Sequence, residues 1–414
     1  MSSPGSTRTG IDADIDRHRL ATRLGRAVAG LAEPPCPPVA VVDRDAFDAN
    51  AADLVRRAGG KPVRLATKSL RIPALGERAL AVPGFHGVLA YTLREALWLF
   101  DAGVCDDIVM GYPSVDRVAI RRLCDDPAAA RAITLMIDDP AHLEVVTAVR
   151  GPGKTRIRVA IDIDAGLRLG PARVGPRRSP LYDVEPVVAL ARDVVRRRAF
   201  DLVGVMTYEG QVAGVPDRVP GRPGRSLVVR TLKSASVSQI HERRARLAGA
   251  LSEVTRLQFW NAGGSGSIET SSHDPAVTEV TAGSGLLGPT LFDHYACFTP
   301  QPAAFFGLPV VRRPALDCVT VAGGGLIASG PAGRTRSPTP WAPPGLRLTA
   351  TEGAGEVQTP LVGATAASLA LGDLVWFRHA KSGELAEHVR RVHVVSGDAV
   401  VDRMPTYRGT GNAW

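Results

Sequence analysis

Lysine is the scarcest basic side chain in this sequence. It occurs only five times among the 50 Lys and Arg residues, so the chain uses arginine wherever a cation is sufficient. Arginine does not deprotonate or form an imine under ordinary conditions, whereas a lysine amine does both. A lysine in a structured segment is therefore a candidate nucleophile. The five are Lys61, Lys68, Lys154, Lys233 and Lys381.

Position separates these five lysines into two groups. Lys61 and Lys154 lie in Gly/Pro-rich turns and Lys233 lies in a segment predicted as a polar loop, so these three are expected to face solvent. Lys68 and Lys381 form the other group, in structured segments. Lys68 follows an apolar run, and in a β/α barrel the residues at the carboxyl end of a strand point into the mouth of the site. We predict that Lys68 is the reactive amine. The alternative is a surface lysine at the end of a strand.

Two glycine–serine segments follow consecutive strand-like runs late in this region. Gly263–Ser267 follows the run 257–261, and Gly283–Ser284 comes just after the run 277–281. Such loops let backbone N–H groups converge on an anion, and barrels commonly bind phosphate after their last two strands. The alternative is that both are simple turns. A lysine imine together with a phosphate cup is what pyridoxal 5'-phosphate requires.

The elements that position these residues form a regular series. Between residues 39 and about 300, short β-branched runs alternate with amphipathic stretches such as 45–58 and 93–102. This rhythm predicts an α/β fold, a (β/α)8 TIM-type barrel, with an open doubly wound sheet as the alternative. The predicted strands are 39–42, 63–66, 87–90, 108–110, 133–137, 157–163, 202–207, 257–261 and 277–281.

The amino-acid composition and the periodicity of the sequence change after about residue 298. Proline and glycine become dense, and the helical periodicity gives way to short strand-like runs at 317–322, 346–350, 374–378 and 392–395. This pattern predicts an all-β domain. The expected domains are an N-terminal helical extension (1–36), a cofactor-binding barrel (37–298) and a C-terminal β domain (299–414).

Composition excludes several other classes of protein. The net charge is +9, but the basic residues are spread along the chain and aromatic residues make up only 5%, so no nucleic-acid partner is expected. We find no apolar run long enough to span a membrane and no apolar signal segment near Met1. The five cysteines form no close pairs, which suits a reducing compartment, and we expect a cytoplasmic protein.

Five motifs in a fixed order carry a family resemblance. They are Arg64–Lys68, Asp162–Arg168, Tyr208–Gly210, the Gly263–Ser267 loop and the Gly283–Ser284 loop. Their order resembles that of fold-type III pyridoxal-phosphate enzymes. It is most similar to the D-threonine aldolase and D-serine dehydratase group of the alanine racemase-like barrel superfamily. The similarity spans roughly residues 37 to 400.

The resemblance implies roles for the matching residues. Lys68 would carry the cofactor as a Schiff base, Arg168 would face the pyridine nitrogen, and Tyr208 would line the pocket. Members of this group are typically homodimers in which the β domain of one subunit closes the site of the other. The residues implied in phosphate binding are Gly264, Ser265, Gly266, Gly283 and Ser284.

The sequence departs from the family at two places. Gln211 stands where the family usually has a histidine, and glutamine is not a general base. The family's β domain also carries a histidine and a second metal ligand two residues later. Here His379 is present, but Lys381 holds the second position and would repel a cation, so we expect no metal site of the usual kind. Glu384 is an alternative ligand.

The expected function is that of a lyase acting on a β-hydroxy D-amino acid. Retro-aldol cleavage would give glycine and an aldehyde, and dehydration would give a keto acid and ammonia. His379 would move the proton, and the Lys381 ammonium would polarise the substrate hydroxyl or carboxylate in place of a metal; the alternative is a lysine that faces solvent. The rival functions are a racemase or decarboxylase of the same superfamily and a non-catalytic cofactor carrier.

Overall fold

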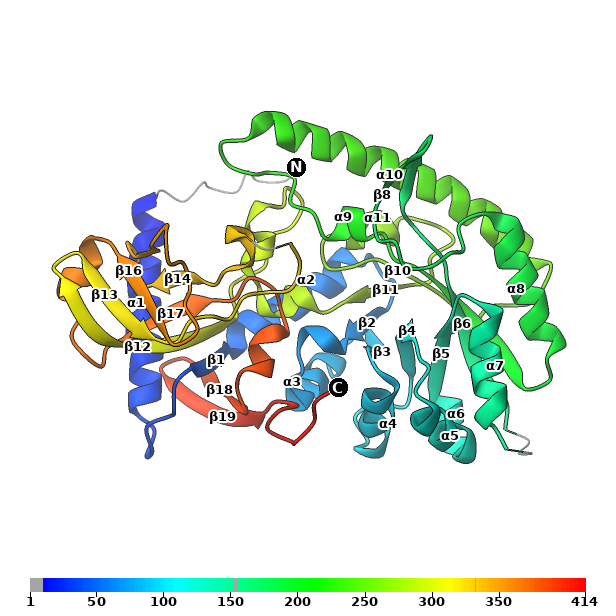
Figure 1. The fold of residues 1–414 in the computed structure, drawn as a ribbon, viewed down its shortest axis with the longest axis horizontal. Helices are drawn as coiled ribbons and strands as arrows, with labels where there is room; N and C mark the ends of the chain where they lie inside the picture. Colours follow the sequence, from blue (N-terminus) through cyan, green and yellow to red (C-terminus); the bar gives the residue numbers. More distant parts are fainter. Residues whose placement is uncertain (1–9, 152–154, 332) are drawn as a thin grey trace. The chain divides into compact units, whose positions relative to one another are not determined.

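The computed structural model describes residues 10–151, 155–331 and 333–414, so Lys154 lies outside the described residues. By their contacts these residues divide into two compact units (Figure 1). The barrel unit comprises Asn50–Leu286, His294–Thr299 and Trp414. The sheet unit comprises the chain up to Ala49, Leu287–Asp293 and Pro300–Ala413.

The barrel unit is built on eight strands that close into a barrel, in the order β10-β11-β2-β3-β4-β5-β6-β9. All neighbouring pairs are parallel, and β11 closes the ring on β2 with Val280 opposite Val63. The predicted (β/α)8 fold is therefore confirmed. The strands are β2 (Val63–Ala66), β3 (Phe85–Ala90), β4 (Ile108–Pro113), β5 (Ile133–Ile137), β6 (Ile157–Asp162), β9 (Phe200–Thr207), β10 (Phe259–Ala262) and β11 (Glu279–Ala282).

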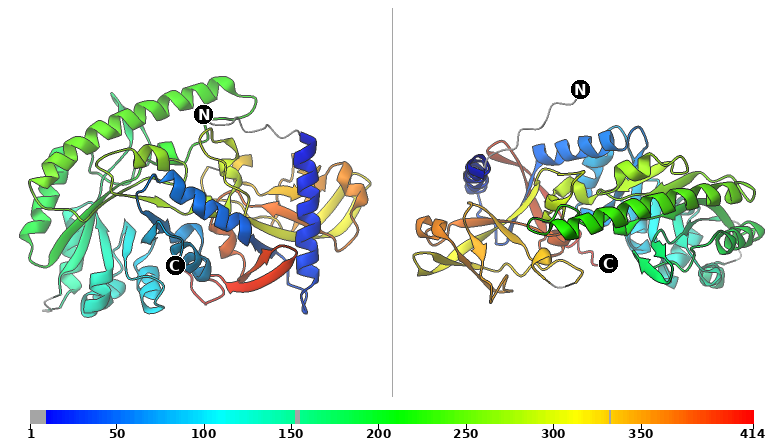
Figure 2. Two further views of the ribbon diagram at one scale, coloured as in Figure 1. Left: turned by 180° about the vertical axis from the view of Figure 1, so that it is seen from behind. Right: turned by 90° about the horizontal axis from the view of Figure 1, so that it is seen from above.

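Helices connect the barrel strands and lie around their outside, with α10 as the long green helix of Figures 1 and 2. Several begin at residues that satisfy their free N–H groups: Thr92 caps α4, and Asp116 caps α5. The helices are α2 (Arg44–Arg57), α3 (Pro73–Leu80), α4 (Leu93–Asp101), α5 (Arg117–Asp125), α6 (Pro127–Ala132), α7 (Pro140–Val149), α8 (Val184–Arg196), α9 (Gly210–Ala213), α10 (Pro223–Ser252) and α11 (Ile268–Ser272). A small antiparallel hairpin, β7 (Leu167–Leu169) and β8 (Ala172–Val174), follows β6.

The sheet unit contains a nine-stranded sheet and helix α1 (Gly10–Ala29). Leu24, Ala27 and Val28 recur at helical spacing on α1, and they pack in one apolar cluster with residues such as Phe305 and Trp376. The strands are β1 (Val39–Asp43), β12 (Ala304–Ala315), β13 (Cys318–Ala322), β14 (Thr339–Ala342), β15 (Arg347–Leu348), β16 (Gln358–Val362), β17 (Leu374–Arg378), β18 (Arg391–Ser396) and β19 (Ala399–Pro405).

Two local features differ from the predictions. The run 39–42 does form a strand, β1, but it pairs with β12 and β18 of the sheet unit and not with a barrel strand. Lys233 lies in helix α10 rather than in a loop, and its side chain is 11% exposed and forms an ion pair with Asp217 at 3.0 Å. The contacts of α10 with α8 and α9 support a segment whose serine-rich sequence is a weak helix former.

Candidate functional site

A cavity opens at the carboxyl ends of the barrel strands. It encloses about 570 Å³ of space, part of it open to solvent. Lys68 and both predicted glycine–serine loops lie in its wall, although they come from opposite ends of the barrel sequence. The lining residues are Ala66, Lys68, Ser69, Leu89, Gly111, Tyr112, Arg178, Met206, Tyr208, Asn261, Gly263, Gly264, Ser265, Thr281, Ala282, Gly283 and Ser284.

Lys68 lies on a short 3-10 turn, Thr67–Ser69, directly after β2. Its side chain is exposed, while the neighbouring Thr67 and Ser69 are buried and fix the turn. The Lys68 Nζ donates a hydrogen bond of 2.7 Å to the Tyr112 Oη. The amine is therefore held at one place in the cavity wall by a partner that the sequence did not identify.

Close backbone packing accounts for the glycines of the two loops. Gly263 has φ +85°, a left-handed conformation that side chains disfavour. A Cβ at Gly283 would lie 2.5 Å from the Ala66 carbonyl oxygen. At Gly264 a Cβ would reach within 3.2 Å of the Tyr208 ring. At Gly283 the bare backbone therefore approaches the strand end that precedes Lys68, and at Gly264 it approaches the Tyr208 ring.

Ser265 ties the two loops together. Its Oγ accepts hydrogen bonds from the N–H groups of Gly285, at 3.0 Å, and Gly283, at 3.4 Å, and lies 3.3 Å from the Ser284 Oγ. Gly266 packs behind the loop, because a Cβ there would lie 2.4 Å from the Ala213 carbonyl oxygen. Of the five residues predicted to bind phosphate, Gly264, Ser265, Gly283 and Ser284 line the cavity.

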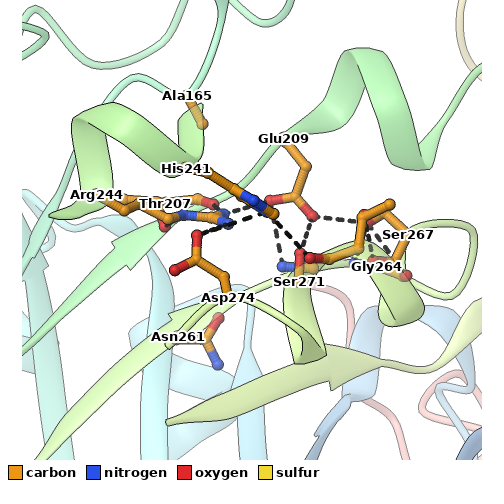
Figure 3. Close-up of polar contacts among 12 residues, drawn as sticks. Ala165, Thr207, Glu209, His241, Arg244, Asn261, Gly264, Ser267, Ser271 and Asp274 are labelled. Carbon is orange, nitrogen blue, oxygen red and sulfur yellow. Dashed lines mark hydrogen bonds and ion pairs between the residues drawn. The ribbon is translucent and has the colours of Figure 1, made fainter. Parts of the chain in front are cut away.

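A buried carboxylate holds the first loop in place (Figure 3). The Glu209 carboxylate accepts hydrogen bonds from the hydroxyls of Ser267, at 2.7 Å, and Ser271, at 2.5 Å, and from the Gly263 N–H at 3.4 Å. The Ser267 Oγ in turn accepts a hydrogen bond from the Gly264 N–H at 3.1 Å. Glu209 follows β9, so it fixes a loop that belongs to the next strand of the barrel.

Arg244 of α10 neutralises this carboxylate. Its guanidinium donates to Glu209 at 2.8 Å, to Asp274 at 3.2 Å and to the Thr207 carbonyl at 2.8 Å. The side chains of Arg244, Glu209 and Asp274 are 1%, 2% and 3% exposed. Buried charges persist only when they are paired and hydrogen-bonded, and both conditions hold here.

Two tyrosines line the cavity in different electrostatic surroundings. Burial, followed by the nearby charge of Glu209, raises the pKa of Tyr208 to about 12, so its phenol stays protonated. Burial would also raise the pKa of Tyr112, but the charge and hydrogen bond of Lys68 and the charge of Arg178 together bring it below the ordinary 10.0.

Two arginines occupy distinct positions near the site. Arg168 lies on β7, 3.3 Å from the centroid of the Tyr182 ring and 3.6 Å from Asp183, and it is not among the residues that line the cavity. Arg178 does line it, 5.7 Å from the centroid of the Tyr112 ring and 5.9 Å from that of Tyr208. Arg178 was not predicted from the sequence, because no motif distinguishes it from the many other arginines of the chain.

A second acidic position borders the site. Asp162 ends β6 and lines a small neighbouring pocket of about 290 Å³, which shares Arg178, Met206 and Tyr208 with the main cavity. Burial, followed by the charge of Asp138, raises the pKa of Asp162 to about 7. Gln211, where the family has histidine, is buried and donates to the Ala165 carbonyl at 2.7 Å.

The remaining predicted site residues belong to the sheet unit. His379 is 3% exposed, and burial, followed by the charge of Arg378, lowers its pKa to about 3, so the ring is neutral. Lys381 Nζ donates to the Ser329 Oγ at 2.9 Å. The Glu384 carboxylate accepts from the Ser329 N–H at 3.0 Å. Within the described parts of the chain, no group of three or more His, Cys, Asp or Glu residues is arranged to hold a metal ion.

Comparison with known families gives one match. A family model described as alanine racemase, N-terminal domain, matches residues 42–290. No curated protein matches the chain. Within the described residues, no helix has the length and apolar character needed to cross a membrane.

Solved structures share the fold at low identity. D-threonine aldolase from Filomicrobium marinum is 20% identical, with a TM-score of 0.76 over 90% of this chain and 95% of its own. D-threo-3-hydroxyaspartate dehydratase from Delftia sp. HT23 is 20% identical, with a TM-score of 0.69 over 90% and 97%. Alanine racemase from Corynebacterium glutamicum is 18% identical, with a TM-score of 0.54 over 82% and 88%. At this identity the similarities establish the fold.

Proposed function

The chain belongs to the alanine racemase N-terminal domain family, and we propose that it is a pyridoxal-phosphate enzyme whose cofactor is held by the amine of Lys68. One observation carries the proposal: an accessible lysine amine and two glycine–serine loops line the same cavity. The amine is the group that bonds to an aldehyde, and the loops are suited to a phosphate.

The residues present fit this cofactor. Gly264 and Gly283 place backbone without side chains at the cavity wall, and Ser265 and Ser284 supply hydroxyls there. Tyr208 adds a protonated phenol. The predicted role of Arg168 at the pyridine nitrogen remains part of the proposal. When bound, pyridoxal phosphate supplies an electron sink for the bond that breaks at the substrate Cα.

We propose a β-hydroxy D-amino acid as the substrate, cleaved to glycine and an aldehyde or dehydrated to a keto acid and ammonia. The fold shared with D-threonine aldolase and D-threo-3-hydroxyaspartate dehydratase supports this class. In the cavity, Arg178 offers a cation for the substrate carboxylate, since the described residues provide it with no hydrogen bond or ion pair. The fold shared with alanine racemase supports a racemase as the alternative.

The proposed roles of His379 and Lys381 concern the substrate hydroxyl. His379 would move the proton as a neutral ring, which is a weak base because its pKa is about 3, and the Lys381 ammonium would polarise the hydroxyl or carboxylate. If the enzyme is a homodimer with shared sites, mixing inactive Lys68→Met and Lys381→Met proteins restores part of the activity, because one site of the mixed dimer then carries no substitution. No recovery after verified subunit exchange excludes the shared site.

The direct test is a spectrum followed by chemical labelling. We expect the purified protein with pyridoxal phosphate to absorb in the visible range, and borohydride reduction to attach the cofactor to Lys68, as shown by peptide mass spectrometry. Lys61→Met serves as the control and should label normally, because Lys61 is absent from the cavity wall. D-threonine and D-serine then distinguish the reactions by their products, and exchange of the Cα hydrogen without cleavage identifies the racemase. A protein that never labels at Lys68 overturns the proposal.

A further inference from the structure

The hydrogen bond between Lys68 and Tyr112 joins two side chains that are far apart in sequence. Tyr112 lies on β4, and its Oη is 2.7 Å from the Lys68 Nζ within the same cavity. We propose that Tyr112 is a catalytic acid–base residue, which takes the proton that Lys68 sheds and returns it during the reaction. This inference rests on the proposed function, because it concerns the same amine.

The proton transfer is balanced between the two side chains. An N–H bond of the Lys68 ammonium breaks as an O–H bond forms on the Tyr112 phenolate, so an ion pair becomes a neutral amine and a phenol. The neutral amine is the form that bonds to an aldehyde or accepts a proton from a substrate. The 2.7 Å contact already lies within the distance required of a general acid or base, and no rearrangement is needed.

The charges around Tyr112 favour a phenol that can lose its proton. Lys68 and Arg178 are cations beside it, Asp162 is an acid that acts in the opposite direction, and Tyr208 is the other phenol in the cavity. The two cations outweigh both burial and Asp162, so the pKa of Tyr112 is lowered, whereas that of Tyr208 is raised. The phenol of Tyr112 therefore loses its proton more readily than that of Tyr208, although both line the same cavity.

The first experiment needs neither cofactor nor activity. Tyrosinate absorption of the cofactor-free protein is titrated with pH for wild type, Tyr112→Phe and Lys68→Met. We expect one tyrosine of the wild type to ionise at a lower pH than the others. This early ionisation disappears in Tyr112→Phe and moves to higher pH in Lys68→Met, because the neighbouring cation is lost. If Lys68→Met leaves the titration unchanged, the pair is not coupled and the proposal is overturned.

The second experiment uses the enzyme loaded with pyridoxal phosphate. For Tyr112→Phe we expect kcat to fall about 100-fold, which is typical for loss of a general acid–base group. The pH at which kcat stops rising should also move upward. In wild type the first proton is lost from the coupled pair of Lys68 and Tyr112, whereas in Tyr112→Phe it must be lost from Lys68 alone. Tyr91→Phe removes a phenol that is not part of the cavity lining and should keep the wild-type profile.

The outcomes separate the two proposals. If wild type labels at Lys68 but Tyr112→Phe keeps both the wild-type kcat and the wild-type pH profile, the role of Tyr112 is overturned and the proposed function stands. If kcat falls without any change in the pH profile, Tyr112 only packs against the site and the acid–base role is likewise overturned. If neither protein labels at Lys68, the proposed function fails and the role of Tyr112 in it fails too.

Discussion

Two regions at the carboxyl end of the barrel hold their polar side chains differently. Beside the end of β9, Glu209 and Arg244 form a buried ion pair, whereas in the accessible region Lys68 and Arg178 are exposed and Tyr112 of β4 is half-buried. Glu209 and Arg244 are 2% and 1% exposed, and both make several polar contacts. Lys68 is exposed, and Tyr112 is its one hydrogen-bonded side-chain partner among the described residues. The first region fixes the loop that follows β10, whereas in the second we propose that a proton moves between Lys68 and Tyr112.

The largest expected effect follows from neutralising the fixed region. Glu209→Gln leaves Arg244 buried without one of its two acidic partners and places amide hydrogens against hydroxyl donors. Breaking a buried ion pair in this way costs about 3–5 kcal/mol of unfolding free energy, measured by urea denaturation. Binding of pyridoxal phosphate should weaken more than that of pyridoxal, which lacks the phosphate.

A matched control uses an exposed ion pair in the same unit. Glu144→Gln breaks the contact with Arg197, whose side chain is 29% exposed against 61% for Glu144. The expected cost is below about 1 kcal/mol, because solvent screens exposed pairs. Equal losses for Glu144→Gln and Glu209→Gln would contradict the distinction between the two regions.

In the accessible region, removing a charge should affect binding rather than folding. Arg178→Leu is expected to lower kcat/KM for an amino acid about 100-fold, which corresponds to loss of roughly 2–3 kcal/mol of charge-assisted binding. The unfolding free energy should change by less than about 1 kcal/mol, as is usual where no buried network is broken. Arg168→Leu, tested in parallel, probes the separate role proposed for Arg168 at the pyridine nitrogen. A wild-type kcat/KM in Arg178→Leu would reject Arg178 as the partner of the substrate carboxylate.

Much of this arrangement could be predicted from the sequence, because barrel strands and glycine loops depend on local patterns. Residues 63–66 are apolar or long-chained and form β2, and the glycines at 263 and 283 are needed by the backbone itself. Tyr112, which was not predicted as a site residue, owes its place in the site to a partner, Lys68, that is distant in the sequence. Tyr112 lies beyond the predicted strand 108–110, and the actual strand continues to Pro113.

Strand β1 illustrates the same limit at the level of topology. Val39–Asp43 is buried throughout, as a barrel strand would be, and its apolar run is typical of any central strand. Its partners are β12 and β18, which lie more than 250 residues away in the sequence. A local pattern shows that such a strand is buried, but not which sheet contains it.

The last expected effect concerns the acid next to the accessible region and appears only as the pH rises. The pKa of Asp162 is raised from 3.8 to about 7, so folding favours its protonated form. The stability that Asp162 contributes is complete below pH 4 and is lost as the pH rises to about 7. Asp162→Asn cannot ionise and should therefore be more stable than wild type at pH 8, by up to about 4 kcal/mol for a pKa raised by about 3, and no more stable at pH 4, as measured by urea unfolding. Asp201→Asn, at a carboxylate 39% exposed, is the control and should show no such gain. Equal stability of Asp162→Asn and wild type at pH 8 would mean that Asp162 ionises in the folded protein at no cost. In that case Asp162 would be a carboxylate that pairs with Arg178, one of the two cations beside Tyr112.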